Sequence, residues 1–286
     1  MYSMNCMNCM NTCGLFELLG YVGCTLLVPI IGVCTGMDLD GKRDMALGMG
    51  LGSVLWGQIV TMGVLEWKTQ LYLYRNQSDK KAWNERYVHI QKHVQKHIMN
   101  IEGLLLIGGY LMFTWKMGWM PLSYERSRNG IQWINVGGQL LLQDFLQYWM
   151  HRWEHRIKWL YRNAHMEHHK HREPVWWDAF DGTCMDTTVM ILVPLFFTAQ
   201  TMRQVNVWSY MTFGTIYANW LTCIHSNTEL PWESFFTGIG FGTSRDHLVH
   251  HRLYAYNFGH MFMYWDKWFG TYYVIGSVRT QNTRDI

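Results

Sequence analysis

The sequence predicts an all-α integral membrane protein, a helical bundle of about four spanning helices plus a hydrophobic hairpin, which carries a cytosolic histidine-rich helical cap. Three observations support this fold class. Long uncharged apolar runs alternate with short polar blocks, histidines cluster at helical spacings in the second half, and only 16% of residues are charged, against about 25% in average domains. The formal net charge of +3 is too small to indicate a nucleic-acid partner.

Residues 1–13 are expected to form an N-terminal tail. Cys6, Cys9 and Cys13 make a C-x2-C-x3-C run that fits metal binding or acylation beside a membrane, but a disordered tail with free thiols is the simpler interpretation. The tail lacks the basic segment and the small-residue cleavage site of a typical signal peptide.

Residues 14–143 are predicted to form the transmembrane anchor. The runs Leu18 to Met37 and Met45 to Leu65 are uncharged, and each has about the 20 residues needed to span a bilayer. Gly48 and Gly52 form a small-xxx-small pair, which lets two helices approach closely.

The segment 66–100 within the anchor is basic and is predicted to be cytosolic. It holds seven Lys or Arg against three acidic residues, and His89, His93 and His97 recur every four residues. That spacing also suits metal ligands, but the lysines between them favour a helix on the membrane surface.

Two further spans are predicted from Gly103 to Met120 and from Ile131 to Leu142. Because Lys and Arg concentrate in 66–100 and 152–172, the positive-inside rule places the N-terminus and every histidine cluster on the cytosolic side. A later apolar pair, Thr187 to Met202 and Asn206 to Thr222, either spans as a hairpin or enters the bilayer only partly.

The histidines of the second half fall into three clusters at helical spacings. Residues four apart, or at i, i+3 and i+4, share one face of a helix. Imidazole is a common ligand for transition metals, and the missing C-x2-C partner argues against a structural zinc finger. Eight ligands are too many for one ion, so two adjacent metal ions are predicted. The clusters are His151 and His155; His165, His168 and His169; and His247, His250 and His251.

The order of these motifs resembles the fatty acid hydroxylase and sterol desaturase superfamily of membrane proteins. H-R-x-x-H is followed by W-L-Y-R-x-x-H-x-x-H-H and a distal H-x-x-H-H, and the closing Tyr-Asn-Phe-Gly and Tyr-Trp-Asp-Lys-Trp-Phe-Gly-Thr blocks also match. The resemblance covers roughly Asp144 to Thr271. It implies a catalytic domain at 144–275, a C-terminal tail at 276–286, and His225 as a further ligand.

The resemblance also implies the chemistry. Such proteins hold two irons in a cytosolic histidine cage, usually at the endoplasmic reticulum, and use dioxygen and two electrons to hydroxylate or desaturate a lipid that enters from the bilayer. Zinc is expected to replace iron in overexpressed protein, because nitrogen sites bind zinc more tightly. Since no haem, flavin or dinucleotide motif is visible, a cytochrome b5-like donor and its reductase are expected to supply electrons.

Ligand imidazoles need a partner for the outer ring nitrogen. Asp144 and Asp246, each beside a cluster, are predicted to serve. Asp144 is expected to accept from a ligand imidazole, because it shares a stripe with His151 and His155; anchoring an Arg on a neighbouring helix, or lying solvated at the membrane interface, are its alternatives. His171 and His260 are predicted not to bind metal.

The substrate class stays open. The Tyr-Asn-Phe-Gly block favours the sterol desaturase branch, whereas Ala179-Phe180-Asp181 departs from the Ala-Phe-His-Pro of that branch. Sphingoid and fatty-acyl substrates fit as well, and hydroxylation and desaturation share their first hydrogen abstraction. The alternative from another class is a non-catalytic membrane protein that retains the cage to bind metal.

Overall fold

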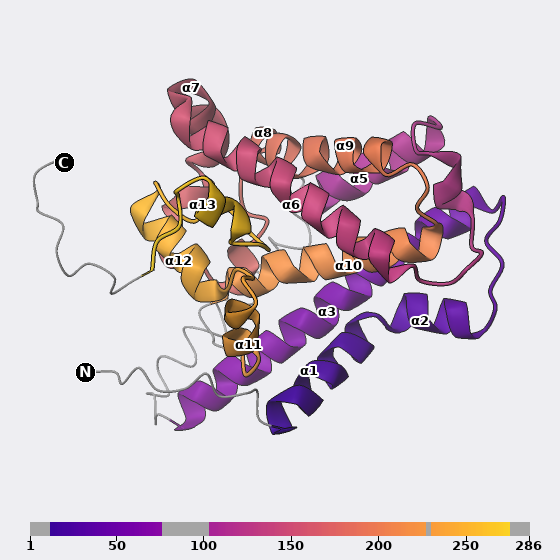
Figure 1. The fold of residues 1–286 in the computed structure, drawn as a ribbon, viewed down its shortest axis with the longest axis horizontal. Coiled ribbons are helices and arrows are strands. Elements are labelled where there is room, and N and C mark those ends of the chain that lie inside the picture. The colour runs from indigo at the N-terminus through magenta and orange to yellow at the C-terminus, as the bar shows by residue number, and fades with distance from the viewer. Residues whose placement is uncertain (1–11, 76–102, 227–229, 275–286) are drawn as a thin grey trace, which may run out of the picture.

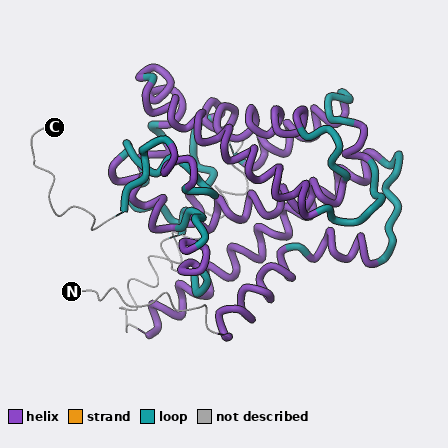
Figure 2. The backbone as a smooth tube through the Cα atoms, in the orientation of Figure 1, coloured by secondary structure: helices purple, strands orange, loops and turns teal. Residues whose placement is uncertain are grey.

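The computed structural model describes residues 12–75, 103–226 and 230–274. The described residues are helices and loops, with no strand beyond one antiparallel bridge between Phe241 and Phe262, and the all-α prediction is confirmed for them (Figure 2). The longer helices are α1 (Thr12–Thr25), α2 (Leu27–Cys34), α3 (Arg43–Arg75), α5 (Leu104–Lys116), α6 (Trp133–Arg156), α9 (Val193–Thr201), α10 (Val207–Ile224) and α12 (Ser244–Leu253).

Short helical turns join these helices and lie mostly at one end of the bundle. Figure 1 shows α7, α8, α12 and α13 gathered at the end where α6 finishes, while long loops occupy the opposite end. The short elements are η1 (Leu122–Glu125), α7 (Lys158–Leu160), η2 (Tyr161–His165), η3 (His168–Lys170), η4 (Trp176–Asp178), α8 (Cys184–Thr187), η5 (Thr188–Leu192), α11 (Glu233–Gly238) and α13 (Tyr264–Trp268).

Two helical segments among the described residues are long and apolar enough to cross a membrane, Arg43–Leu71 and Cys184–Thr201, or three if the bent pair α1 and α2 counts as one span. This is fewer than the four spans and the hairpin predicted. The helix α5 has 13 residues, and at 1.5 Å per residue it is about 20 Å long, short of the hydrocarbon core.

The predicted first span is broken rather than continuous. A bend of 69° separates α1 from α2. Pro29 lies in the first turn of α2, and because proline lacks an N–H it cannot bond back to the carbonyl four residues earlier. The break at Leu26 therefore has a local cause that a window of apolar residues does not reveal.

The second half of the predicted hairpin is the central helix of the molecule. Most side chains of α10 are buried, and the helix packs against α3 and α6. Ser53 bonds Thr215 at 2.8 Å, and Gln58 Nε2 donates to Asn219 Oδ1 at 2.9 Å, so hydrogen bonds as well as apolar contacts join α3 to α10. The helix ends at Ile224, directly before His225.

The other element that positions the histidines is α6. It runs without a break for 24 residues, as predicted, and carries His151 and His155 in its last two turns. The helix α3 continues to Arg75, ten residues past its predicted span. The remaining predictions for His89, His93, His97, Cys6 and Cys9 and for the tail 276–286 lie outside the described residues.

Candidate metal centre

All nine histidines predicted as ligands lie together at the end of the bundle where α6 finishes. Eight of them are at most 7% exposed, and His155 is half-buried. They form two groups, in each of which one nitrogen per ring lies within 4.8 Å of all the others. The first group is His151, His155, His165, His169 and His250; the second is His168, His225, His247 and His251.

The middle cluster reaches this arrangement by a different local structure from the one predicted. His165 ends a π-helical turn, η2, and His168 begins a separate 3-10 turn, η3. The two turns send neighbouring histidines to different groups, His165 and His169 to the first and His168 to the second. In contrast, His247, His250 and His251 share the single helix α12, as predicted.

The inner ring nitrogens face one another at short distances. In the first group, Nε2 of His151 lies 3.0 Å from Nε2 of His165, and Nε2 of His169 lies 3.1 Å from that of His250. In the second group, Nε2 of His225 lies 2.9 Å from that of His247. Each group therefore converges on a common point.

The outer nitrogens fix which form each ring takes. Nδ1 of His151 donates to the carbonyl of Phe258 at 2.8 Å, and Nδ1 of His225 donates to the carbonyl of Leu221 at 2.7 Å. His168 and His250 donate in the same way to backbone carbonyls at 3.1 and 2.8 Å. A carbonyl only accepts, so in these rings Nδ1 carries the proton of the neutral imidazole and Nε2 is left with its lone pair.

Facing lone pairs repel one another unless a cation lies between them. Burial lowers the pKa of His168 to about 4 and that of His250 to about 3, and it holds the pKa of His151 well below its usual value. Near pH 7 the four rings whose Nδ1 donates to a carbonyl are therefore neutral, and each faces its neighbours with the lone pair of Nε2. Such a set of neutral nitrogen donors fits divalent transition metals.

Two acidic side chains lie beside the outer ring nitrogen of His165, and the sequence analysis did not predict this role for either of them. Nδ1 of His165 lies 2.8 Å from Asp186 Oδ1 and 3.5 Å from Glu154 Oε2. Burial and the adjacent charge of Asp186 raise the pKa of Glu154 above its usual value. The role of Glu154 could have been predicted, because it lies between two ligands on α6. The role of Asp186 could not, because no sequence spacing links it to His165.

Asp144 does not partner a ligand imidazole, so its predicted role is wrong in this structure. Its fully buried carboxylate accepts from the backbone N–H of Met261 at 2.8 Å and of Phe262 at 2.9 Å, and from Trp265 Nε1 at 2.9 Å. The outer nitrogen of His151 instead donates to the carbonyl of Phe258, which belongs to the same loop as Met261 and Phe262. Asp144 therefore anchors the loop that supplies that carbonyl.

Asp246 likewise contacts no ring nitrogen of the cage. Its carboxylate accepts from the backbone N–H of Thr243 at 3.0 Å and from the hydroxyl of Thr243 at 2.9 Å. Asp246 is the third residue of α12, where a side chain caps the free amides of the helix start. Its contribution is to begin the helix that carries three ligands.

His171 and His260, which were predicted not to bind metal, lie outside both groups of histidines. His171 lies between two carboxylates, 3.5 Å from Asp178 and 3.2 Å from Asp181. His260 is buried, and its ring stacks on His151 with centroids 4.8 Å apart. Its nitrogens do not converge with either group.

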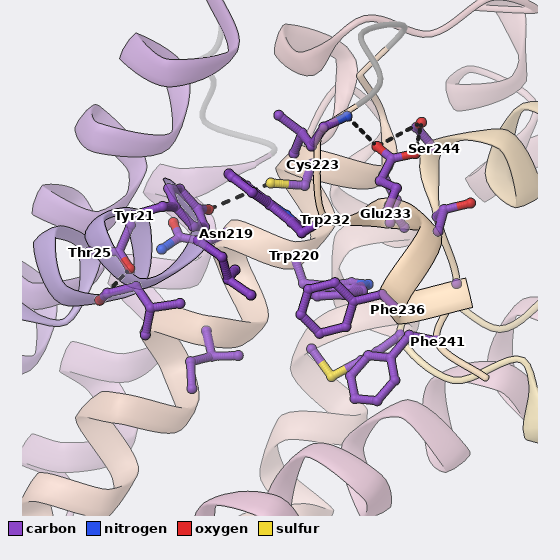
Figure 3. Close-up of a pocket in the computed structure, with 18 of the residues that line it drawn as sticks. Tyr21, Thr25, Asn219, Trp220, Cys223, Trp232, Glu233, Phe236, Phe241 and Ser244 are labelled. Carbon is purple, nitrogen blue, oxygen red and sulfur yellow. Dashed lines mark hydrogen bonds between the residues drawn. The ribbon is translucent and has the colours of Figure 1, made fainter. Parts of the chain in front are cut away.

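An apolar cavity of about 200 Å³ borders the second group. Its lining includes Ile224, next to His225, and Met261, next to His260. Figure 3 shows Trp220, Phe236 and Phe241 on one side of it, with Glu233 bonded to Ser244 near the start of α12. Other polar residues line it too, among them Thr25, Asn219 and Thr243, but most of the surface that the cavity exposes is apolar, which suits an apolar ligand.

A larger cavity of about 500 Å³ lies between α3, α5, α9 and α10. It too is apolar, with Leu111, Leu195 and Phe213 in its walls, and Tyr217 brings one of its few hydroxyls. No residue of its lining is a sequence neighbour of a cage histidine. The larger cavity approaches the second group at Leu221, whose carbonyl accepts from Nδ1 of His225, and the smaller cavity approaches it at Ile224 and the start of α12.

Comparisons with known proteins agree with this geometry. Residues 137–271 match the family model of the fatty acid hydroxylases. The chain is 46% identical over 177 residues, 62% of its length, to an alternative squalene epoxidase of Phaeodactylum tricornutum. It is 31% identical over 141 residues, 46% of its length, to sphinganine C4-monooxygenase 2 of Arabidopsis thaliana.

A cholesterol 25-hydroxylase-like protein of Danio rerio is 25% identical over 203 residues, which cover 66% of this chain and 73% of that protein. The matched part spans only 51% of the squalene epoxidase and 52% of the sphinganine monooxygenase. No solved structure matches the chain. The segment 137–271, with the histidine motifs it contains, is therefore a domain of the fatty acid hydroxylase and sterol desaturase superfamily.

Proposed function

We propose that this protein is a membrane-bound oxygenase that holds two irons in the histidine cage and uses dioxygen and two electrons to oxidise a lipid. The observation that carries the proposal is the pair of converging histidine groups, nearly sealed from solvent and bordered by an apolar cavity. The endoplasmic reticulum, with the cage towards the cytosol, is the proposed location.

Iron bound by these histidines would supply the redox chemistry that activates dioxygen. The chain itself contributes four things. Its outer hydrogen bonds hold the rings in one tautomer, and the carboxylates of Asp186 and Glu154 orient His165. The tight burial of the rings excludes water, and the apolar cavity holds a carbon atom of the substrate near the cage. Zinc is expected to occupy the same donors in overexpressed protein.

For the substrate we propose a lipid of the sterol class or one of its hydrocarbon precursors. The cavity walls beside the cage are almost entirely apolar, and the relative with 46% identity is named for squalene, an unsaturated hydrocarbon. Oxygen addition to a double bond is therefore included with hydroxylation and desaturation. Sphingoid and fatty-acyl lipids remain outcomes of the test.

The electrons are proposed to come from a small carrier of the cytochrome b5 type with its reductase. Arg156, Lys158 and Arg162 are exposed at the tip formed by α6 and α7, on the same end of the molecule as the cage. Such a basic surface attracts an acidic carrier and raises its rate of encounter.

The test is turnover by the purified protein in lipid vesicles, loaded with ferrous iron and supplied with the reductase and carrier. A lipid extract, squalene, a sterol and a sphingoid base are offered in turn under ¹⁸O₂, and products are read by mass spectrometry. We expect one substrate to gain one labelled oxygen or to lose two hydrogens. Retention of both metals without any metal-dependent product would instead establish the non-catalytic metal-binding protein.

A further inference from the structure

A row of buried glutamines on α6 leads towards the metal centre, and the proposed function does not account for it. Gln139, Gln143 and Gln147 recur every four residues, and His151 follows after the same interval. The three glutamines are 0%, 0% and 2% exposed, while Leu141 on the same helix is 42% exposed. Spacing by four keeps neighbouring members of this glutamine row in contact range along one side of a helix.

Side chains from three other elements meet the glutamine row. Gln139 Nε2 donates to the hydroxyl of Tyr124 at 3.2 Å, and the hydroxyl of Thr198 donates to Gln143 Oε1 at 3.2 Å. The hydroxyl of Tyr217 donates to Gln147 Oε1. The row thus lies where α6 meets η1, α9 and α10, and α6 itself runs towards the end of the bundle that holds the cage (Figure 1).

These contacts leave two amide atoms unpaired. Oε1 of Gln139 and Nε2 of Gln143 are buried, and neither forms a hydrogen bond of ordinary geometry with a described residue, although the amide of Gln143 lies close enough to the Tyr217 hydroxyl to interact with it. An unsatisfied buried polar group costs about 1–3 kcal/mol. Hydrogen bonding between helices explains the three paired atoms, but it does not explain why two amide groups are kept where their second atom is unpaired.

Water is the ligand that this pattern of groups selects. Internal water occupies polar sites where it finds two to four partners, and it bonds to a donor and an acceptor equally well. Here Gln139 offers an acceptor and Gln143 offers a donor one turn later on the same helix. The nearby hydroxyls of Tyr124 and Tyr217 each both donate and accept.

We propose that the glutamine row binds a file of internal water and serves as a proton route between the remote end of the bundle and the cage. Twelve residues separate Gln139 from His151, or about 18 Å along the helix. The amides anchor the water molecules, and protons move through the waters by exchange of hydrogen bonds.

The need for protons rests on the proposed function. An oxygenase combines dioxygen, two electrons from its carrier and two protons, places one oxygen atom in the substrate and releases the other as water. Four of the cage histidines hold their outer protons on carbonyls, and the nearby smaller cavity exposes mostly apolar surface. Neither supplies two protons in each cycle, whereas the glutamine row ends one turn from His151.

The first test needs neither metal nor turnover. Hydroxyl radicals generated from water by an X-ray beam label side chains beside internal water, so metal-free protein in vesicles is irradiated and mapped by mass spectrometry. Tyr217 and Tyr124 are buried and should nevertheless be labelled. The substitution Gln143→Met, which keeps the length of the side chain but removes its amide, should abolish most of that labelling, and Leu141→Met on the exposed side of the same helix should not.

Absence of label on both tyrosines in the unaltered protein, or equal label in Gln143→Met, would overturn the proposal. If Gln143→Met does not fold, Gln139→Met takes its place, because it removes the other amide that has an unpaired atom and should abolish most of the labelling in the same way. A row that serves only to join helices predicts lower thermal stability for both variants and no labelling in any of them.

The second test measures proton delivery during turnover. Gln143→Met should lower kcat about tenfold, a modest part of the effect usually seen when a positioned proton donor is lost, and should increase the solvent deuterium isotope effect. The KM for the lipid and the metal content should stay unchanged. An unchanged isotope effect would reject the proton route. If the unaltered protein forms no product, the proposed function fails, and the labelling experiment still decides whether the glutamine row binds water.

Discussion

At the scale of single residues, the orientation of each imidazole decides what the cage can bind. Four of the rings give their outer proton to a backbone carbonyl, and His165 faces the carboxylates of Asp186 and Glu154. A carboxylate stabilises the donating ring more strongly than a carbonyl does. His165 is therefore expected to be the most electron-rich donor of the first group.

The first prediction concerns that difference. Asp186→Asn keeps the shape of the side chain but removes its charge, and we expect metal affinity to fall about 10- to 100-fold, as is usual when the partner of a ligand is lost. Titration with a competing chelator measures the change. The control is Glu167→Gln, which removes the charge of an exposed residue between His165 and His168. Equal metal affinity in the two variants would show that Asp186 has no such role.

The second prediction separates the converging histidines from the histidines of the basic segment. His250→Ala removes a fully buried member of the first group, so at least one of the two metals should be lost. His93→Ala should leave metal content near two per chain. Elemental analysis of both purified variants measures the metal content per chain. Loss of metal from His93→Ala would show that the histidines of the segment 89–97 bind metal.

At the scale of elements, the loop 258–262 is held by side chains rather than by secondary structure. Asp266 accepts from the backbone N–H groups of Phe258 and Gly259 at 2.8 and 2.7 Å, and Asp144 accepts from the next three. The two carboxylates thus fix every amide of this loop. In return the loop presents the carbonyl that sets the tautomer of His151.

The third prediction follows from this anchoring. In Asp144→Asn the new amide group points donors at backbone N–H groups, so buried donors lose their acceptor at about 1–3 kcal/mol each. We expect a lower melting temperature and also weaker metal binding, because Phe258 would no longer hold His151. Thermal unfolding in detergent, with and without chelator, measures both effects. An unchanged melting temperature would contradict the anchoring role.

The histidine positions could be predicted because their signal is local. His247, His250 and His251 share a helix whose spacing is visible in the sequence, and α6 carries His151 and His155 in the same way. The contacts of Asp144 with Met261 and of Asp186 with His165 could not be predicted, since they join residues 117 and 21 positions apart. The bend between α1 and α2 could have been predicted from Pro29, but this proline lies within an apolar run that hydropathy alone predicts to be a single span.

At the scale of the whole molecule, the cage makes stability depend on acidity. Burial lowers the pKa of His168 and His250 from 6.5 to about 4 and about 3. In unfolded chains these rings take up protons below pH 6.5, whereas in the folded protein they do not. The free energy of unfolding therefore falls as the pH decreases from about 6.5 towards 4.

The fourth prediction applies this to metal-free protein. Its free energy of unfolding should be nearly constant above pH 7 with respect to these rings and should fall below pH 6.5, by about 1.4 kcal/mol per pH unit for each ring that stays neutral. Denaturant unfolding in detergent across pH 5 to 8 is the measurement. A stability that rises towards pH 5 would contradict the buried, neutral state of the cage.

The order of the ligands along the chain bears on how the protein matures. The first group needs His151 near the end of α6 and His250 on α12, and the second needs His168 and His225 as well as α12. Neither set of donors is complete until residue 251 has left the ribosome, by which time the helices before it are already at the membrane. On the proposed function, metal loading therefore follows the synthesis of α12, and the metal-free cage is a state through which the chain passes before it binds its ions.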